Sequence, residues 1–156
     1  MPHIPSMILF MNSAPDHTSC IEKQNKLLKE FEKCTSSEAV YEKLIEMGRS
    51  FPHASEDQFT ESCIVPGCQS KMLLKSKLLD NKLTFSIYSD ALISRGLAAL
   101  LLEIYSGEPP EVILTCKPEV LEKLKLLESL TPGRVNGLAS LLTRMKQEAL
   151  TVLTQK

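Results

Sequence analysis

One cysteine, Cys68, stands in a setting that suits a reactive thiol. It follows Pro66 and Gly67 and precedes Gln69 and Ser70, immediately before a predicted strand. Proline restricts the backbone and glycine lacks a Cβ atom, so the pair favours a sharp turn that presents the thiol to another molecule. The chemistry expected of such a residue is nucleophilic attack by the thiolate.

Attack requires the thiolate, and a free cysteine with a pKa of about 8.5 is only slightly ionised at neutral pH. We therefore expect a group near Cys68 that favours the charge: backbone N–H groups of the turn, the amide of Gln69, or a cation supplied by the fold. The competing interpretation is that Cys68 is a small apolar residue buried at the start of a strand.

The other cysteines show no metal or disulfide pattern. The chain has five cysteines, an odd number at low density, which indicates a reducing compartment, and we expect a cytoplasmic location. No CxxC pair occurs, and the histidines have no ligand spacing with the cysteines, so we expect no metal site. Cys20, Cys34 and Cys116 are interpreted as spacer or core residues. Cys63 precedes Cys68 closely and is a possible redox partner.

Composition and charge exclude several classes of partner. The chain has 156 residues, enough for one domain, and its 43% hydrophobic content is typical of globular proteins. A net charge of -1 gives no reason to expect nucleic acid or a membrane surface. The longest apolar runs are too short to span a membrane. Residues 1–20 lack the pattern of a secretory signal and are predicted to be a flexible extension before one domain over residues 21–156.

Two amphipathic helices are predicted at the start of this domain. Apolar residues lie on one helical face over residues 21–31. A second helix follows, for which Thr35 and Glu38 fit a capping box, and it ends at Gly48. Residues 50–61 have no sustained period and are predicted to be a connecting loop.

The middle of the chain predicts a β-hairpin. Residues 71–79 and 82–88 are separated by Asp80 and Asn81, and apolar side chains alternate along the second segment. These features favour antiparallel strands joined by a tight turn.

Helices and one short strand are predicted after the hairpin. Gly96 within the first of these helices costs about 1 kcal/mol relative to alanine, which indicates close packing against another element. The fold class is therefore α+β, a small, mainly antiparallel sheet packed with helices. The predicted elements are a helix from about Asp90 to Gly107 with Ser89 as cap, a strand over 112–115, a helix starting at Pro118, and a helix capped by Thr131 with Pro132 at its first position.

The segment PGCQS, residues 66–70, resembles the active-site loop of the SufE and CsdE sulfur-acceptor proteins, and the resemblance extends over about residues 22–150. Ordered blocks on both sides of the loop also resemble this family. They are Tyr41, Leu44, Ile45, Glu46, Gly48 and Pro52; Ser89, Asp90, Ala91, Ile93, Gly96 and Leu97; and Leu130, Thr131, Pro132, Arg134, Asn136, Gly137 and Leu138.

The resemblance implies a fold shared with IscU-type iron–sulfur scaffolds. It implies that Cys68 accepts persulfide sulfur from a pyridoxal-phosphate-dependent cysteine desulfurase similar to SufS or CsdA, stimulates that enzyme, and relays the sulfur to a SufBCD-like cluster-assembly scaffold. The chain would be a carrier and not an enzyme, because the pyridoxal phosphate (PLP) belongs to the desulfurase. It would carry no cofactor of its own and act as a monomer or homodimer.

The resemblance also implies supporting residues around the nucleophile: Gly67, Gln69, Ser70, Arg134 and Asp90. For two of them a simpler interpretation remains open. Arg134 is equally compatible with a solvated surface arginine. Asp90 is compatible with an acidic residue that stabilises a helix start without any function.

Two positions depart from the family pattern. Cys63 stands where relatives usually have an asparagine, and Leu73 stands where a tryptophan is common. We expect Leu73 to alter the packing beneath the loop. Cys63 is expected to face the core or to point away from Cys68. The alternative is that the two sulfurs meet, in which case a Cys63–Cys68 disulfide would act as an oxidative off-switch. Two other functions remain open: an iron–sulfur scaffold with Cys63, Cys68 and Cys116 as ligands, and a thiol oxidoreductase using Cys63 and Cys68.

Overall fold

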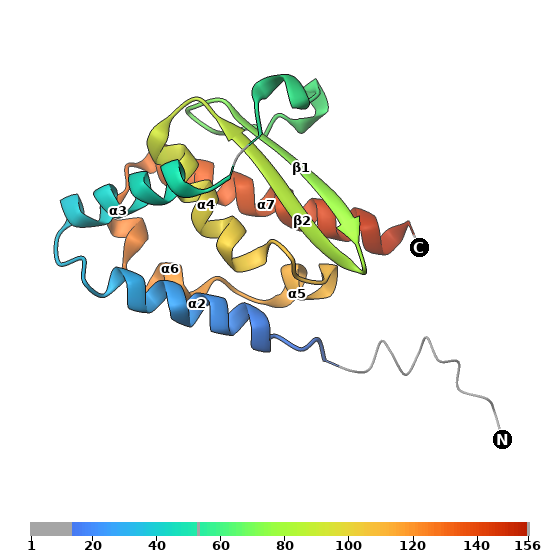
Figure 1. The fold of residues 1–156 in the computed structure, drawn as a ribbon, viewed down its shortest axis with the longest axis horizontal. Helices are drawn as coiled ribbons and strands as arrows, with labels where there is room; N and C mark the ends of the chain where they lie inside the picture. Colours follow the sequence, from blue (N-terminus) through green and yellow to red (C-terminus); the bar gives the residue numbers. More distant parts are fainter. Residues whose placement is uncertain (1–13, 53, 156) are drawn as a thin grey trace.

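Helices pack against one face of a single antiparallel hairpin in the computed structural model, which describes residues 14–52 and 54–155 (Figure 1). This arrangement confirms the predicted α+β class. The elements in chain order are α2 (Thr18–Phe31), α3 (Ser37–Ser50), the short 3-10 helices η1 (Glu56–Gln58) and η2 (Glu61–Cys63), β1 (Met72–Leu79), β2 (Lys82–Ser89), α4 (Leu92–Tyr105), α5 (Pro110–Thr115), α6 (Glu119–Lys123), η3 (Leu126–Ser129) and α7 (Pro132–Thr154).

The hairpin forms where the sequence predicted it. Strands β1 and β2 pair in a register that runs from Met72 opposite Ser89 to Leu79 opposite Lys82. The two residues between them, Asp80 and Asn81, have φ angles of 52° and 61°. Two consecutive positive φ angles define the turn whose twist matches that of the strands, and Asp and Asn tolerate this conformation.

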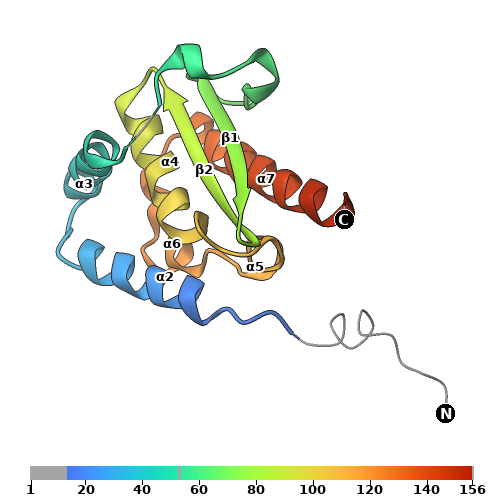
Figure 2. The same ribbon diagram turned by 45° about the vertical axis from the view of Figure 1, so that its right-hand side comes forward.

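Helices α4 and α7 support the hairpin. Both views show α7 beside β1 and α4 near β2 (Figure 2). A hydrogen bond of 3.0 Å from the Ser76 hydroxyl to the Glu148 carboxylate joins β1 to α7. Helix α4 is buried almost throughout, so it forms the centre of the hydrophobic core.

Helices α3 and α4 approach each other closely at Gly96, as predicted. A Cβ atom built at Gly96 would lie 2.1 Å from the carbonyl oxygen of Leu44, so only glycine fits. The neighbouring Gly48 of α3 meets the same stretch of α4, where its Cβ would lie 2.8 Å from the Gly96 nitrogen. This contact fixes the start of α4, which carries part of the candidate site.

Residues 112–115 are helical, so the predicted strand there is wrong. They belong to α5, in which the carbonyl of Pro109 accepts hydrogen bonds from the N–H groups of Val112 and Ile113. Pro110 at the first helical position favours this helix start. A short apolar run does not distinguish a buried strand from a buried helical turn.

Several helix starts differ from the sequence-based predictions by one or two residues. The cap of α3 is Ser36 and not Thr35, and its hydroxyl accepts a hydrogen bond from the Ala39 N–H. Helix α4 begins at Leu92, after Asp90. Pro118 lies just before α6, whose first helical residue is Glu119. Thr131 caps α7 as predicted and accepts from the Arg134 N–H.

The N-terminal boundary of the domain also needs correction. Helix α2 already begins at Thr18, and Cys20 is fully buried in the core. Residues 18–20 therefore belong to the folded domain and not to a flexible extension. The rest of the predicted extension falls largely on residues 1–13, outside the described part of the chain. Among the described helices, none is both long and apolar enough to cross a membrane.

Candidate functional site

A tight loop over residues 65–70 carries Cys68 between η2 and β1. The two ends of the loop are joined by a hydrogen bond of 2.9 Å from the Val65 N–H to the Met72 carbonyl. Gly67 has a φ angle of 84°, and a Cβ atom there would lie 2.7 Å from the Ser140 hydroxyl on α7. Glycine is therefore required both by the backbone conformation and by the close approach to α7.

The Cys68 thiol lies against the first turns of α7. Its sulfur donates to the Gly137 carbonyl oxygen at 3.7 Å, and it lines a small cavity of about 20 Å³. The Gln69 side chain packs directly against Gly133. A Cβ atom at Gly133 would lie 2.2 Å from the amide nitrogen of Gln69. The apolar part of this cavity is formed by α4, β1 and α7: Met72, Leu97, Ala98, Leu138 and Leu141.

The surroundings of Cys68 favour the neutral thiol. Burial raises the pKa of the Cys68 thiol, and a thiol that donates to a carbonyl is stabilised in its protonated form. The expectation of a nearby group that favours the thiolate is therefore wrong for this arrangement. The nearby cation, Arg134, bonds hydroxyl groups instead.

Arg134 and Asp90 hold the segment that follows Cys68. One guanidinium nitrogen of Arg134 donates to the Ser70 hydroxyl at 3.1 Å and to the Ser94 hydroxyl at 2.6 Å. The Asp90 carboxylate accepts from the Lys71 N–H at 3.1 Å. All the predicted supporting residues therefore lie in the loop or contact the segment that follows Cys68. Gly67, Gln69 and Ser70 belong to the loop, whereas Arg134 and Asp90 bond Ser70 and Lys71.

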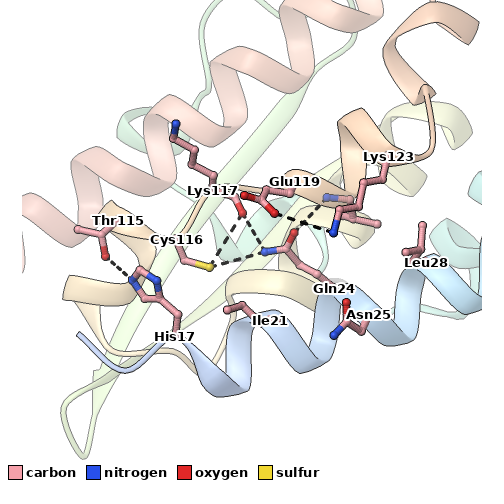
Figure 3. A pocket seen from close by; sticks show the side chains of 11 residues that line it. His17, Ile21, Gln24, Asn25, Leu28, Thr115, Cys116, Lys117, Glu119 and Lys123 are labelled. Carbon is pink, nitrogen blue, oxygen red and sulfur yellow. Dashed lines mark hydrogen bonds and ion pairs between the residues drawn. The ribbon is translucent and has the colours of Figure 1, made fainter. Parts of the chain in front are cut away.

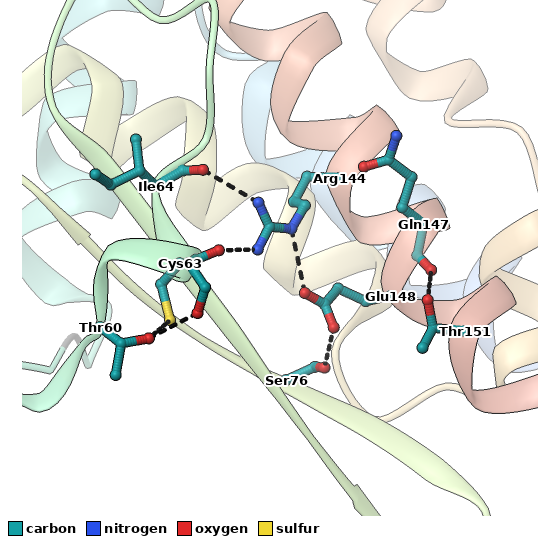
Figure 4. A network of polar contacts seen from close by, with 9 residues as sticks. Thr60, Cys63, Ile64, Ser76, Arg144, Gln147, Glu148 and Thr151 are labelled. Carbon is teal, nitrogen blue, oxygen red and sulfur yellow. Dashed lines mark hydrogen bonds and ion pairs between the residues drawn. The ribbon is translucent and has the colours of Figure 1, made fainter. Parts of the chain in front are cut away.

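Cys63 lies on η2 and does not line the cavity of Cys68. Its sulfur lies 3.6 Å from the hydroxyl oxygen of Thr60 (Figure 4), and both thiols are free. The other departure from the family pattern, Leu73, is buried in β1 and forms an isolated bridge with Ile64. Whether Cys63 and Cys68 form a disulfide on oxidation stays a prediction.

Cys116 belongs to a different part of the molecule. It lines a cavity of about 360 Å³ between α2 and the α5–α6 segment, and the Gln24 amide nitrogen lies 3.6 Å from its sulfur (Figure 3). Cys116 and Cys68 thus line separate cavities, which disfavours the alternative of a cluster ligated by both together with Cys63. Within residues 14–52 and 54–155, no three His, Cys, Asp or Glu side chains are arranged to hold a metal ion.

The sequence-based reasoning did not identify the face of α7 that receives the loop. Gly133, Gly137, Ser140 and Arg144 follow one another at spacings of three or four residues, which places them on one side of a helix. The small residues on this face admit the Cys68 loop. Such a small-residue stripe was the available signal, whereas nothing in the sequence near Ser94 marks it as the partner of Arg134.

Comparison with family models and curated proteins gives consistent matches. The model "SufE: Fe-S metabolism associated domain" matches residues 25–149. An uncharacterised SufE-like protein of Synechocystis is 29% identical over 143 residues, covering 92% of this chain and 90% of the relative. Another from Rhizobium meliloti is 37% identical over 114 residues, covering 70% of this chain and 81% of the relative.

A plant relative and a solved structure extend these matches. SufE-like protein 1 of Arabidopsis thaliana, named as chloroplastic/mitochondrial, is 31% identical over 129 residues, covering 82% of this chain but only 35% of that longer protein. The solution structure of a hypothetical protein from Thermus thermophilus superimposes with a TM-score of 0.70 at 25% identity, covering 85% of this chain and 96% of that one.

Proposed function

The chain belongs to the SufE family, which is associated with Fe–S metabolism, and we propose on this premise that Cys68 accepts sulfur from a cysteine desulfurase. The observation that carries the proposal is the position of Cys68, on a glycine-containing loop where it lines a small cavity. In this proposal the chain is a sulfur carrier that stimulates the desulfurase, and PLP remains with that enzyme. In the next step, Cys68 passes the sulfur to a cluster-assembly scaffold of the SufBCD type.

The proposed transfer is a thiol exchange. The Cys68 thiolate attacks the outer sulfur of the desulfurase persulfide, a new S–S bond forms on Cys68, and the desulfurase cysteine leaves as a thiolate. The products are a Cys68 persulfide and the restored desulfurase thiol, so the step needs no oxidant or reductant.

The resting geometry constrains how this transfer starts. Because burial raises the pKa of Cys68, the thiol must lose its proton when the desulfurase engages the loop. The environment of the thiol depends on a loop, so movement of residues 65–70 relative to α7 is sufficient to remove the Gly137 contact. The proposal therefore assigns the activation of Cys68 to the complex and not to the isolated chain. The cytoplasmic location remains a prediction from the cysteine content.

Intact mass measurement tests the proposal. The protein is incubated without reductant with a PLP-dependent cysteine desulfurase and free cysteine, and we expect a mass increase of one sulfur atom. Cys68→Ser should show no increase, whereas Cys34→Ser, which changes a cysteine that lines a different cavity, should gain sulfur as the wild type does. Sulfur uptake by Cys68→Ser would contradict the assignment of the acceptor.

A further inference from the structure

Arg144 on α7 contacts the chain on both sides of Cys63 (Figure 4). Its guanidinium donates to the Ile64 carbonyl at 3.1 Å and also to the Ser62 carbonyl. These two carbonyls belong to the segment from which the Cys68 loop emerges. The side chain of Arg144 is only 20% exposed, so these bonds form in a partly desolvated setting where charge-assisted contacts are stronger.

A carboxylate fixes the orientation of this arginine. The Nε of Arg144 donates to Glu148 at 3.2 Å, one turn further along α7. The second carboxylate oxygen of Glu148 accepts from the Ser76 hydroxyl of β1. Arg144 therefore joins three elements, η2, α7 and β1. The contact uses the planar fork of donors that arginine has and lysine lacks.

Arg134 and Arg144 hold opposite ends of the Cys68 loop on the same helix. Arg134 bonds Ser70, which follows Cys68, and Arg144 bonds the segment that precedes it. The two arginines are ten positions apart in the sequence, or about 15 Å along the helix axis at a rise of 1.5 Å per residue. Gly137, the contact of the Cys68 sulfur, lies on α7 between them.

We propose that Arg144 is a positioning residue for the Cys68 loop. By holding the carbonyls of Ser62 and Ile64, it fixes the point where the loop leaves η2 and so keeps Cys68 over Gly137. The same bonds hold Cys63 on η2, where its thiol contacts Thr60 and not Cys68. This inference rests on the proposed sulfur-acceptor function and adds a residue that protects the persulfide.

The protective role follows from the chemistry of two neighbouring thiols. If the Cys63 thiolate reaches a Cys68 persulfide, it attacks the inner sulfur, forms a Cys63–Cys68 disulfide and displaces hydrosulfide. The sulfur is then lost to solvent, and no external oxidant is consumed. Fixing η2 on α7 restricts this reaction because a disulfide requires the two Cα atoms to come within about 7 Å.

The test compares Arg144→Gln and Arg144→Lys with Arg49→Gln, which alters an exposed arginine on α3. Amide exchange of Val65, bonded to Met72, should accelerate about tenfold in Arg144→Gln, as expected when a charge-assisted contact worth about 1.5 kcal/mol is lost. Arg144→Lys keeps the positive charge but loses the planar set of guanidinium donors, so the amide exchange of Val65 should accelerate in this variant as well. Exchange in the middle of α4 should stay unchanged, which separates loop release from unfolding.

Persulfide stability provides the second measurement. After loading by a desulfurase, Arg144→Gln should release hydrosulfide and accumulate a Cys63–Cys68 disulfide faster than wild type. Adding Cys63→Ser to this variant should restore the lifetime of the persulfide. Unchanged Val65 exchange in both Arg144 variants would overturn the inference, as would equal persulfide lifetimes in Arg144→Gln and Arg49→Gln. If wild type accepts no sulfur, the proposed function fails, while the exchange experiment still decides whether Arg144 holds the loop.

Discussion

Cys68 and Cys20 are both thiols with a raised pKa, but they occupy very different surroundings. Burial, followed by a hydrogen bond with Cys116, raises the pKa of Cys20 to about 12. Cys20 is fully buried on α2, close to the Gln24 amide, which bonds the Lys117 carbonyl and accepts from the Val120 N–H. For Cys68 burial alone raises the pKa, and the residue is only partly buried.

The difference lies in the backbone that carries each thiol. The core pair Cys20 and Cys116 is held by helix α2 and by the segment after α5, so exposing either sulfur would require breaking core contacts. Cys68 stands on a short loop, which is joined to α7 by hydrogen bonds from the Cys68 thiol to Gly137 and from Arg134 to Ser70. The acidity of the thiol at rest does not distinguish the proposed sulfur acceptor, Cys68, from the core cysteines, whereas the cost of exposing the thiol does.

The largest expected contrast comes from replacing one thiol in each region. Cys68→Ser should abolish sulfur uptake and leave the free energy of unfolding within about 1 kcal/mol of wild type, because the site is half-buried. Cys116→Ser should retain uptake but lose about 1 kcal/mol or more of stability, since it places a hydroxyl in a buried site. Intact mass and urea denaturation measure the two effects. Loss of uptake in a folded Cys116→Ser protein would remove the distinction between the regions.

The hairpin followed from local features, which explains why it was predictable. Alternating apolar residues and the Asp80–Asn81 pair specify a hairpin without help from the rest of the chain. The PGCQS segment indicated a turn around Cys68 for the same reason. Its resemblance to a family is the basis of the proposed function, which the residues alone left open.

The remaining features depend on contacts between distant segments. The partners of Arg144 lie 80 and 82 positions earlier in the chain, and no local pattern predicts such a contact. The expectation of a group that favours the Cys68 thiolate was wrong for the same reason, because the side chains around its sulfur come from α4, β1 and α7 and bury it. The sequence context marked Cys68 as the candidate nucleophile, whereas the protonation state of its thiol depends on tertiary packing.

Two glycines with nearly equal φ angles test the loop geometry. Gly67 and Gly107 have φ angles of 84° and 87°, but a Cβ would meet Ser140 only at Gly67 and nothing within 4 Å at Gly107. Both Gly→Ala variants should lose about 1 kcal/mol of stability through backbone strain. Only Gly67→Ala should also displace the loop and lower the rate of sulfur uptake, by about tenfold or more. Equal uptake rates in the two variants would show that the loop position is unimportant.

Removing Arg134 should affect the loop more than the core. Arg134→Ala leaves the Ser94 hydroxyl, which is 8% exposed, without its arginine partner and frees Ser70. We expect a loss of stability of about 1 kcal/mol and a several-fold slower sulfur transfer. Arg49→Ala, at an exposed position on α3, is the matched control and should change neither quantity. If Arg134→Ala transfers sulfur at the wild-type rate, Arg134 is a structural surface residue only.

The buried Cys20 thiol should make the stability of the protein depend on pH. Unfolding exposes Cys20, whose ordinary pKa is 9.0, whereas the folded protein keeps its proton up to about pH 12. Between these values the unfolded state binds fewer protons than the folded state, so stability is fully present below about pH 9 and falls as the pH rises. Burial also raises the pKa of Tyr105, which acts in the same direction. The slope is at most about 1.4 kcal/mol per pH unit for each such group.

Urea denaturation at about pH 8 and about pH 10 measures this loss. Cys20→Ala should be less stable than wild type at the lower pH, because it leaves a gap in the core, but should lose less stability on going to the higher pH. Cys68→Ala should retain most of the wild-type pH dependence, since a partly buried thiol on a loop is less strongly desolvated than Cys20. If Cys68→Ala flattens the pH dependence and Cys20→Ala does not, then Cys68 is the more deeply buried thiol in solution, and the loop is closed far more tightly over α7 than its polar contacts indicate.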